Sequence, residues 1–347
     1  MVSENLLTIV MLIEIGLLTL AVGLFFLHGI WLFFENKRLQ RLTKSARESL
    51  ARLVTRGFVD VEEIQALREL PNDVQVIAFL EISQTLTGTG KERLGFVAQQ
   101  VGLGDRARKL CESGRWTHRL RGARILSRLD VADPLVQKLL ADPHPAVRAQ
   151  AAEWAAAQPS PPVISAMLVL LADPATQARF AVQNALLRMG GVVAGPLAEF
   201  LETHSGPAAE AGLRVATSLA EPSFGPPALR HSRADNVDVR VAAALLLGGV
   251  ADAAAAERLM ALLSDEDSGV RAAAAKSLGR MQYWQAGSQL AERLRDSAWR
   301  VRKEAGLALR AIGAPGTLFL RRAMKGDDRF AADMAQQVLD LPSAATG

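Results

Sequence analysis

Two hydrophobic patterns divide this chain. Residues 6–34 form a nearly unbroken apolar run, in which Glu14 and His28 are the only ionisable residues. From about residue 116 onward, short amphipathic segments follow one another, and an arginine returns about every 31 residues. A fixed period of this length is typical of solenoids built from helix pairs. The sequence therefore predicts one apolar helix followed by a stack of short helices.

The repeat is defined by an arginine with an aspartate six residues before it. Consecutive register positions lie 30 or 31 residues apart, at Arg148, Arg179, Glu210, Arg240, Arg271, Arg302 and Asp333. His204 and Ala234 replace the aspartate in two units. An arginine fork binds carboxylate and carbonyl groups of an adjacent turn, so repetition makes a ladder. We expect a structural ladder rather than a catalytic array, formed by Asp142, Arg148, Asp173, Arg179, Arg240, Asp265, Arg271, Asp296 and Arg302.

Three segments carry a resemblance to a known family: DPHPAVRAQAA at 142–152, DSGVRAAAA at 267–275 and WRVRKEA at 299–305. They resemble HEAT-like repeats of the phycobilisome-lyase type over about two-thirds of the chain. The resemblance implies an all-α fold, a right-handed α-solenoid (HEAT/armadillo-like superhelix) preceded by one transmembrane helix. It also implies that the aspartate and arginine pack the repeats, and that the second helix of each unit lines the concave side.

The chain divides into five predicted parts. We expect a transmembrane anchor (1–35), a basic juxtamembrane helix (36–57), a helical N-terminal cap (58–115), the solenoid (116–341) and a tail (342–347). Asp60 is expected to cap the first helix of the cap segment. The run Gly88–Lys91 is not a phosphate-binding loop, because no strand precedes it and Glu92 stands where Ser or Thr is needed.

The apolar run is predicted to be an uncleaved membrane anchor. Residues 15–34 supply the ~20 residues that a helix needs to cross a bilayer. A cleaved signal peptide would need a basic start and a shorter apolar core. Residues 35–57 contain seven Lys and Arg, whereas residues 1–34 contain none. This bias predicts a single-pass protein of the cytoplasmic (inner) membrane, with a short N-terminus outside and the solenoid in the cytoplasm.

The anchor and its basic flank suggest two further contacts. We expect lipid headgroups to contact Lys37, Arg38, Arg41 and Lys44, since each basic side chain near an anionic surface contributes ~1 kcal/mol. Gly16, Thr19 and Gly23 share one face of the helix, which permits a homodimer through close helix approach. Glycine is also common in membrane helices that do not dimerise.

Charge and composition argue against several functions. The net charge is +4, but residues 35–57 carry +5 and residues 1–34 carry −2, which leaves +1 from residue 58 onward. A nearly neutral body does not favour a nucleic-acid partner. Cys111 is the single cysteine, and the five histidines lack metal-ligand spacing. We therefore predict no catalysis, no cofactor and no metal.

A protein partner at the membrane remains as the predicted function. The resemblance implies a non-catalytic scaffold or adaptor, as in bacterial accessory subunits of cell-envelope or polysaccharide-assembly complexes. The alternative is a lyase or chromophore-handling factor of the phycobilin-lyase type. Large or polar side chains expected to contact the partner are Trp116, Trp154, Arg230, Arg258, Trp284, Arg293, Trp299, Arg321 and Arg322. Filling gaps in the solenoid core is the other role open to the tryptophans.

Overall fold

A computed structural model describes the backbone of residues 2–56, 60–129 and 132–342, and the side chains from Gly16 onward within these ranges. The regular secondary structure of this part of the chain is helical throughout. It divides into two compact units, residues 1–131 (unit 1) and 132–347 (unit 2). The side chain of Glu14, residues 57–59 and the predicted tail beyond residue 342 lie outside the described residues.

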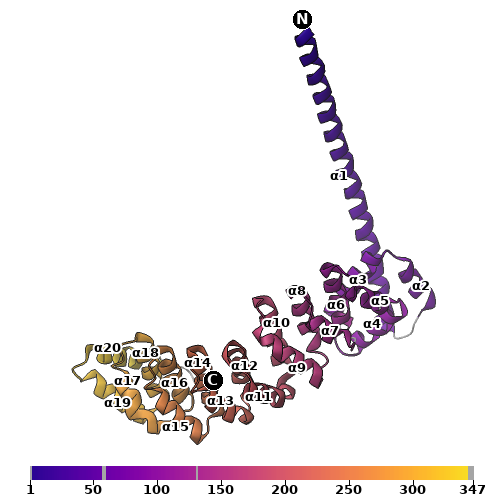
Figure 1. The fold of residues 1–347 in the computed structure, drawn as a ribbon. Helices are drawn as coiled ribbons and strands as arrows, with labels where there is room; N and C mark the ends of the chain where they lie inside the picture. The colour runs from indigo at the N-terminus through magenta and orange to yellow at the C-terminus, as the bar shows by residue number, and fades with distance from the viewer. Residues whose placement is uncertain (1, 57–59, 130–131, 343–347) are drawn as a thin grey trace. The chain divides into compact units, whose positions relative to one another are not determined.

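Unit 1 is built around the lower end of one long helix (Figure 1). Its helices are α1 (Val2–Arg56), α2 (Val61–Glu69), α3 (Asn72–Thr85), α4 (Thr89–Gln100), α5 (Leu103–Cys111) and α6 (Trp116–Leu129). The large apolar side chains of residues 17–34 are exposed. In contrast, Ala46, Leu50 and Leu53 are buried where α1 packs against α3 and α4. The predicted juxtamembrane helix is thus the end of α1, and it supplies core residues.

Local signals in unit 1 account for its helix ends. The Asp60 side chain accepts hydrogen bonds from the backbone N–H groups of Glu62 and Glu63, which confirms the predicted cap of α2. Gly88 has a φ of +54°, which suits glycine, and it lies between α3 and α4. Of the run Gly88–Lys91, only Gly88 therefore lies in the link between the two helices, and the other three residues form the first turn of α4.

Helices α5 and α6 pack without room for a side chain between them. A Cβ atom on Gly122 would lie 2.6 Å from the carbonyl oxygen of Ala107 and 2.7 Å from the sulfur of Cys111. This close approach joins α6 to unit 1, whose boundary falls after Val131. The sequence repeat had placed residues 116–131 at the start of the solenoid.

Unit 2 is a stack of helix pairs (Figure 1). The first helices of the pairs are α8 (Pro145–Ala155), α10 (Thr176–Met189), α12 (Gly206–Leu219), α14 (Val237–Val250), α16 (Ser268–Arg280), α18 (Trp299–Ala311) and α20 (Arg329–Asp340). The second helices are α7 (Leu135–Leu140), α9 (Pro161–Val169), α11 (Ala194–Thr203), α13 (Gly225–His231), α15 (Ala253–Leu262), α17 (Gly287–Arg293) and α19 (Ala314–Met324). The predicted all-α solenoid is confirmed.

Small residues bring the first helices close together. A Cβ atom on Gly248 of α14 would lie 2.6 Å from Cβ of Ser277 on α16, and one on Gly279 would lie 2.8 Å from Cβ of Ala308 on α18. Both contacts join residues 29 apart, so the packing repeats with the sequence. Neighbouring second helices pack less extensively.

This difference in packing sets the direction of curvature within unit 2. In a curved stack the more closely spaced row lies on the inner side. The first helices therefore line the inner side, and α9, α11, α15 and α19 follow the outer edge in Figure 1. The expectation that second helices line the concave side is wrong, because the small residues lie on the first helices.

Candidate partner-binding surface

Arginines of one repeat bind aspartates of the next along the first-helix row. Arg148 donates through Nε and Nη2 to the two carboxylate oxygens of Asp173, at 2.5 and 2.8 Å. Its Nη1 donates to the carbonyl oxygens of Asp142 and Pro143 at 2.8 and 3.1 Å. Arg148 thus fastens its own turn and the following repeat with four hydrogen bonds.

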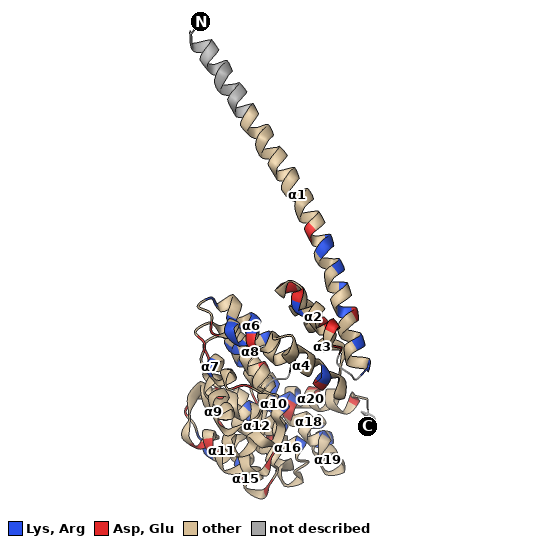
Figure 2. Cartoon of the chain, turned by 90° about the vertical axis from the view of Figure 1, so that its right-hand side faces the viewer, with Lys and Arg blue, Asp and Glu red and all other residues tan. Residues whose placement is uncertain are grey.

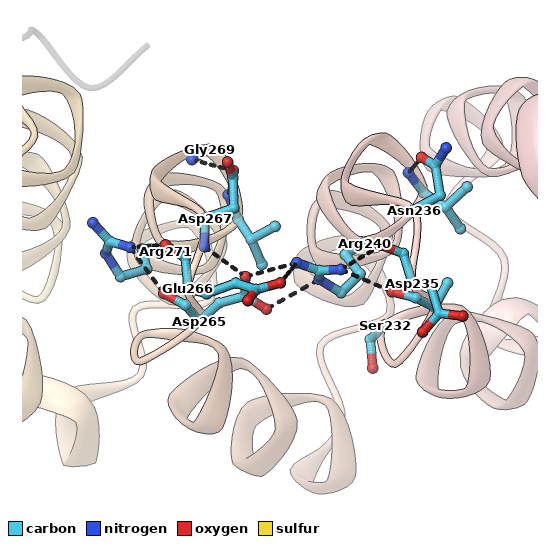
Figure 3. A network of polar contacts seen from close by, with 12 residues as sticks. Ser232, Asp235, Asn236, Arg240, Asp265, Glu266, Asp267, Gly269 and Arg271 are labelled. Carbon is cyan, nitrogen blue, oxygen red and sulfur yellow. Dashed lines mark hydrogen bonds and ion pairs between the residues drawn. The ribbon is translucent and has the colours of Figure 1, made fainter.

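The same arrangement recurs twice further along the stack. Arg240 donates to the carboxylate of Asp265 at 3.1 and 3.0 Å, and Arg271 to that of Asp296 at 2.8 and 2.9 Å. Figure 3 shows the Arg240–Asp265 contact between neighbouring repeats, with Glu266 beside it. Bidentate charge-assisted bonds of this kind fix orientation as well as distance.

Each aspartate also holds its own turn. One carboxylate oxygen of Asp173 accepts from the N–H of Ala175 at 2.8 Å, and Asp296 accepts from Ala298 at 2.9 Å. Burial raises the pKa of both carboxyls, but the hydrogen bonds from arginine and backbone outweigh it, so each pKa lies below its usual value. These carboxylates remain charged at neutral pH and serve packing.

The ladder is interrupted at α12. Arg179 donates to the carbonyl oxygens of Asp173 and Pro174, at 2.6 and 3.3 Å, but His204 stands where the next aspartate would lie. Glu210, at the arginine position, binds Arg214 on its own helix at 2.7 Å. Accordingly, α10 and α12 pack less extensively than α14 and α16.

Contacts on the second-helix row occur near this interruption. The buried ring of His231 donates through Nε2 to the carbonyl oxygen of Leu201 at 2.8 Å, and Arg230 donates to the same oxygen. Arg258 donates to the hydroxyl and carbonyl oxygens of Ser232, both at 2.8 Å. Arg230 and Arg258, which we expected to contact a partner, are therefore engaged within the solenoid.

The predicted tryptophans separate into buried and exposed residues. Trp154 is 1% exposed and fills the core, so the expectation that it contacts a partner is wrong. Trp116, Trp284 and Trp299 are 41%, 64% and 56% exposed. Trp116 belongs to unit 1, whereas the other two lie on different elements of unit 2.

The remaining predicted arginines lie near the end of unit 2. Arg293 is 3.9 Å from Asp296, and Arg321 is exposed on α19. Arg322 lines a cavity of about 330 Å³ together with Glu292, Arg295, Phe319 and Asp328. Because this lining carries both charges, it does not select an ion of one sign.

Two exposed aromatic residues occupy equivalent positions on neighbouring first helices. Trp299 lies three residues before Arg302 on α18, and Phe330 lies three residues before Asp333 on α20. Phe330 is 65% exposed. Helices α18 and α20 pack against each other, so the two exposed rings belong to neighbouring repeats. The sequence analysis missed Phe330, although adding one repeat period to Trp299 leads directly to it.

Cations lie over both rings. The Lys303 ammonium is 5.3 Å from the centre of the Trp299 ring, and the Arg302 guanidinium is 5.0 Å from that of Phe330. Arg302 donates through Nη1 to the carbonyl oxygens of Asp296 and Ser297, at 2.8 and 3.0 Å. Its Nε is buried and has no hydrogen-bond partner among the described residues. We name Trp299, Arg300, Arg302, Lys303 and Phe330 the α18–α20 surface.

Helix α1 carries the residues expected to meet the membrane. It is long and apolar enough to cross a bilayer, and its apolar stretch is unburied. Lys37, Arg38, Arg41 and Lys44 are all exposed, and the Lys37 ammonium lies 4.6 Å from the centre of the Phe33 ring. Gly16 and Gly23 face open space, while the hydroxyl of Thr19 donates to the carbonyl oxygen of Gly16 at 2.9 Å.

Solved structures are similar to this chain at low sequence identity. An engineered protein is 18% identical, with 87% of this chain and 97% of that chain covered and a TM-score of 0.41. A chain from a structure of Kap95p binding to RanGDP is 13% identical over 80% of this chain and 48% of that one, with a TM-score of 0.49. Yeast importin-beta (Kap95p) is 13% identical over 79% and 47%, with a TM-score of 0.47. At TM-scores below 0.5 these likenesses carry no argument about function.

The family comparison is more direct. This chain spans about half the length of the importin-beta chains. No curated protein matches the sequence significantly. The family model described as HEAT repeats matches residues 132–214 and 227–310, on either side of a gap that contains the end of α12 and the start of α13. The ladder, the helix pairs and this match together show that the chain carries HEAT repeats.

Proposed function

We propose that this protein is a non-catalytic, membrane-anchored scaffold whose solenoid holds a protein partner through the α18–α20 surface. The observation that carries the proposal is the exposure of Trp299 and Phe330, at equivalent positions one repeat apart, on a repeat stack whose core is dominated by small and aliphatic residues. Tryptophan and arginine are enriched among residues that dominate binding energy at interfaces. Neither ring contributes to the solenoid core, so packing alone does not explain them.

The polar groups of this surface define the chemistry of the partner. In the repeats beginning with α14 and α16, the equivalent arginine Nε binds a carboxylate of the next repeat. A carboxylate supplied by the partner would satisfy the buried Nε of Arg302, which otherwise carries a desolvation cost of ~1–3 kcal/mol. Arg300 and Lys303 add positive charge around it. The partner is therefore a protein with an acidic segment that also carries apolar side chains.

The exposed apolar stretch of α1 supports attachment to a membrane. The basic residues that follow it favour a cytoplasmic solenoid and a short external N-terminus. Lys37, Arg38, Arg41 and Lys44 are placed to reach lipid headgroups. The open face of Gly16 and Gly23 allows two copies of α1 to approach each other. Cell-envelope or polysaccharide-assembly machinery is one class of membrane complex in which to seek the partner.

A pull-down from native membranes in mild detergent tests the proposal. The full-length chain is compared with the double variant W299A/F330A and with W284A, which removes an exposed tryptophan elsewhere in unit 2. Since each hot-spot residue contributes ~2 kcal/mol or more, the two together correspond to a loss of affinity of roughly 1,000-fold, so we expect the double variant to lose its stoichiometric partner while W284A keeps it. Equal recovery by all three proteins would contradict the proposed surface.

Two additional measurements test the non-catalytic role and the membrane anchor. A visible absorption spectrum of the purified chain detects a bound tetrapyrrole, which would favour the lyase alternative over the scaffold. A variant lacking residues 1–35 should keep the partner but leave the membrane. The deletion must end there, because Ala46, Leu50 and Leu53 belong to the core of unit 1.

A further inference from the structure

Unit 1 contains a concentration of positive charge that the overall charge balance hides. Residues 103–130 contain eight Lys and Arg against three Asp and Glu, a net charge of +5. The chain from residue 58 onward carries only +1, so the rest of that part is acidic on balance. The positive charge is therefore local, and it lies on α5, α6 and the turn between them.

Three arginines of this segment share one face of α6. Arg121, Arg124 and Arg128 follow each other at intervals of three and four residues, which places them along one side of a helix. The opposite side carries the buried residues Ala123, Ile125, Leu126 and Leu129. We call the three arginines the α6 basic stripe. It is a solvent-facing row on a helix whose other side is core.

Most of the charge on this stripe is not neutralised within the protein. Arg121 forms an ion pair with Asp73 on α3. Arg124 and Arg128 are exposed, and neither has an ion-pair partner in the described part of the chain. Trp116, 41% exposed, begins the same helix. Arginine and tryptophan are side chains that favour the headgroup region of a bilayer.

The position of α6 within unit 1 brings the stripe near the membrane surface. Helix α6 packs on α3 and α4, the helices that also hold the end of α1. From Phe34 to Ala46, the first buried residue of α1, the helix rises about 18 Å. In both views, α6 lies toward the end of unit 1 from which α1 extends (Figures 1 and 2). A modest tilt of α1, of the ~20° common in membrane helices, moves this end toward the headgroups.

We propose that the α6 basic stripe binds the anionic lipid headgroups of the membrane that α1 spans, so that unit 1 lies against the bilayer. This inference rests on the membrane anchoring of the proposed function. A nucleic acid is the other polyanion that such a stripe fits. The membrane is favoured because the same compact unit contains the apolar helix, which keeps the stripe close to lipid at all times.

Energy transfer in vesicles tests the proposal with the full-length chain. A fluorescent donor is attached at T117C, an exposed position on α6, while the native Cys111 is buried. The chain is reconstituted into neutral phosphatidylcholine vesicles or into vesicles with one-quarter phosphatidylglycerol, each with acceptor-labelled headgroups. We expect stronger energy transfer in the anionic vesicles than in the neutral ones. This difference between the two vesicle types should become smaller as added salt screens the charges.

A charge-matched pair of variants separates the stripe from net charge. R124Q/R128Q should lower the ratio of docked to undocked unit 1 by roughly 30-fold, which corresponds to ~1 kcal/mol for each arginine. R188Q/R280Q removes the same charge from exposed positions of unit 2 and should behave as the parent chain. In a chain that floats with neutral vesicles, and so is anchored, equal energy transfer in both lipids would overturn the proposal. Energy transfer by R124Q/R128Q equal to that of the parent chain would overturn it as well. Failure to float with neutral vesicles would overturn the anchor, and this inference with it.

Discussion

Two junctions of the solenoid share one sequence period but differ in how they are fastened. Between α16 and α18, Arg271 binds Asp296 bidentately, and Gly279 lets the helices approach closely. Between α10 and α12, His204 replaces the aspartate, and the helices pack less extensively. Since both junctions still stack as HEAT-like pairs, helix length and apolar packing set the period. The ladder adds orientation and stability to a stack that forms without it.

The largest expected effect comes from breaking the ladder where it is complete. Arg271→Ala leaves the Asp296 carboxylate, whose side chain is 4% exposed, without its bidentate partner and with only the more distant Arg293 beside it. We expect a loss of about 3–5 kcal/mol in the free energy of unfolding, measured by urea denaturation followed by circular dichroism. At the interrupted junction, Glu210→Ala removes only a partly exposed ion pair and should change stability by less than ~1 kcal/mol. Similar losses for the two variants would show that the ladder is not what distinguishes the junctions.

The close contact between first helices predicts opposite outcomes for two adjacent glycines on α14. A Cβ atom on Gly248 would lie 2.6 Å from Cβ of Ser277, whereas the nearest atom to one on Gly249 is the far end of Arg280 at 3.8 Å. We expect Gly248→Ala to lose about 1–3 kcal/mol through overpacking. Gly249→Ala should gain up to ~1 kcal/mol from helix propensity. Thermal melting of both variants provides the measurement, and a gain in both would refute the close approach.

Adding a carboxylate at the interrupted junction should strengthen it. His204→Asp places an acceptor where the ladder would continue from Arg179. We expect a gain of about 1 kcal/mol, smaller than a full ladder contact because the Phe200–His204 ring stacking is lost. His204→Asn, of the same shape but without the charge, is the control. The two variants should differ in urea midpoint, and identical midpoints would mean that Arg179 does not reach the new carboxylate.

The smallest expected effect is a pH dependence at the second-helix contact near this junction. Burial lowers the pKa of His231, and although the hydrogen bond to Leu201 acts in the opposite direction, the pKa stays below its usual value. The folded state therefore binds fewer protons than the unfolded state as pH falls below ~6.5. Stability should be fully present above that pH and decline below it. Denaturation between pH 7.5 and 5.5 measures this slope, and His231→Gln should flatten it.

The sequence predicted the repeat well because the same residue types make the same contact in successive repeats. Arg148, Arg240 and Arg271 recur with the aspartates that they bind, so their spacing alone predicts the stack. Asp60 was equally readable, since capping depends on neighbours in sequence. Interactions that are local in the chain, or that repeat with a fixed period, can be recognised from the spacing of residues in the sequence.

The exposure of individual side chains and the curvature of the helix stack were harder to predict from the sequence. Trp154 and Trp299 are the same residue type and both lie on first helices of unit 2, yet one is buried and the other is 56% exposed. Which side of the stack curves inward depends on the relative spacing of two helix rows, set by contacts such as Gly248 with Ser277. The α6 basic stripe was hidden because charges were summed over the whole body rather than along one helix face.

Photocrosslinking at position 299 asks whether a partner binds the α18–α20 surface in the cell. A photoreactive phenylalanine analogue replaces Trp299 in the full-length chain in its native cell, and a second protein carries it at Trp284. We expect one dominant crosslinked protein at position 299, with acidic and apolar residues at the site of attachment, and none of it at position 284. The same product at both positions, or none at position 299 while the chain stays in the membrane, would contradict a scaffold that binds through the α18–α20 surface.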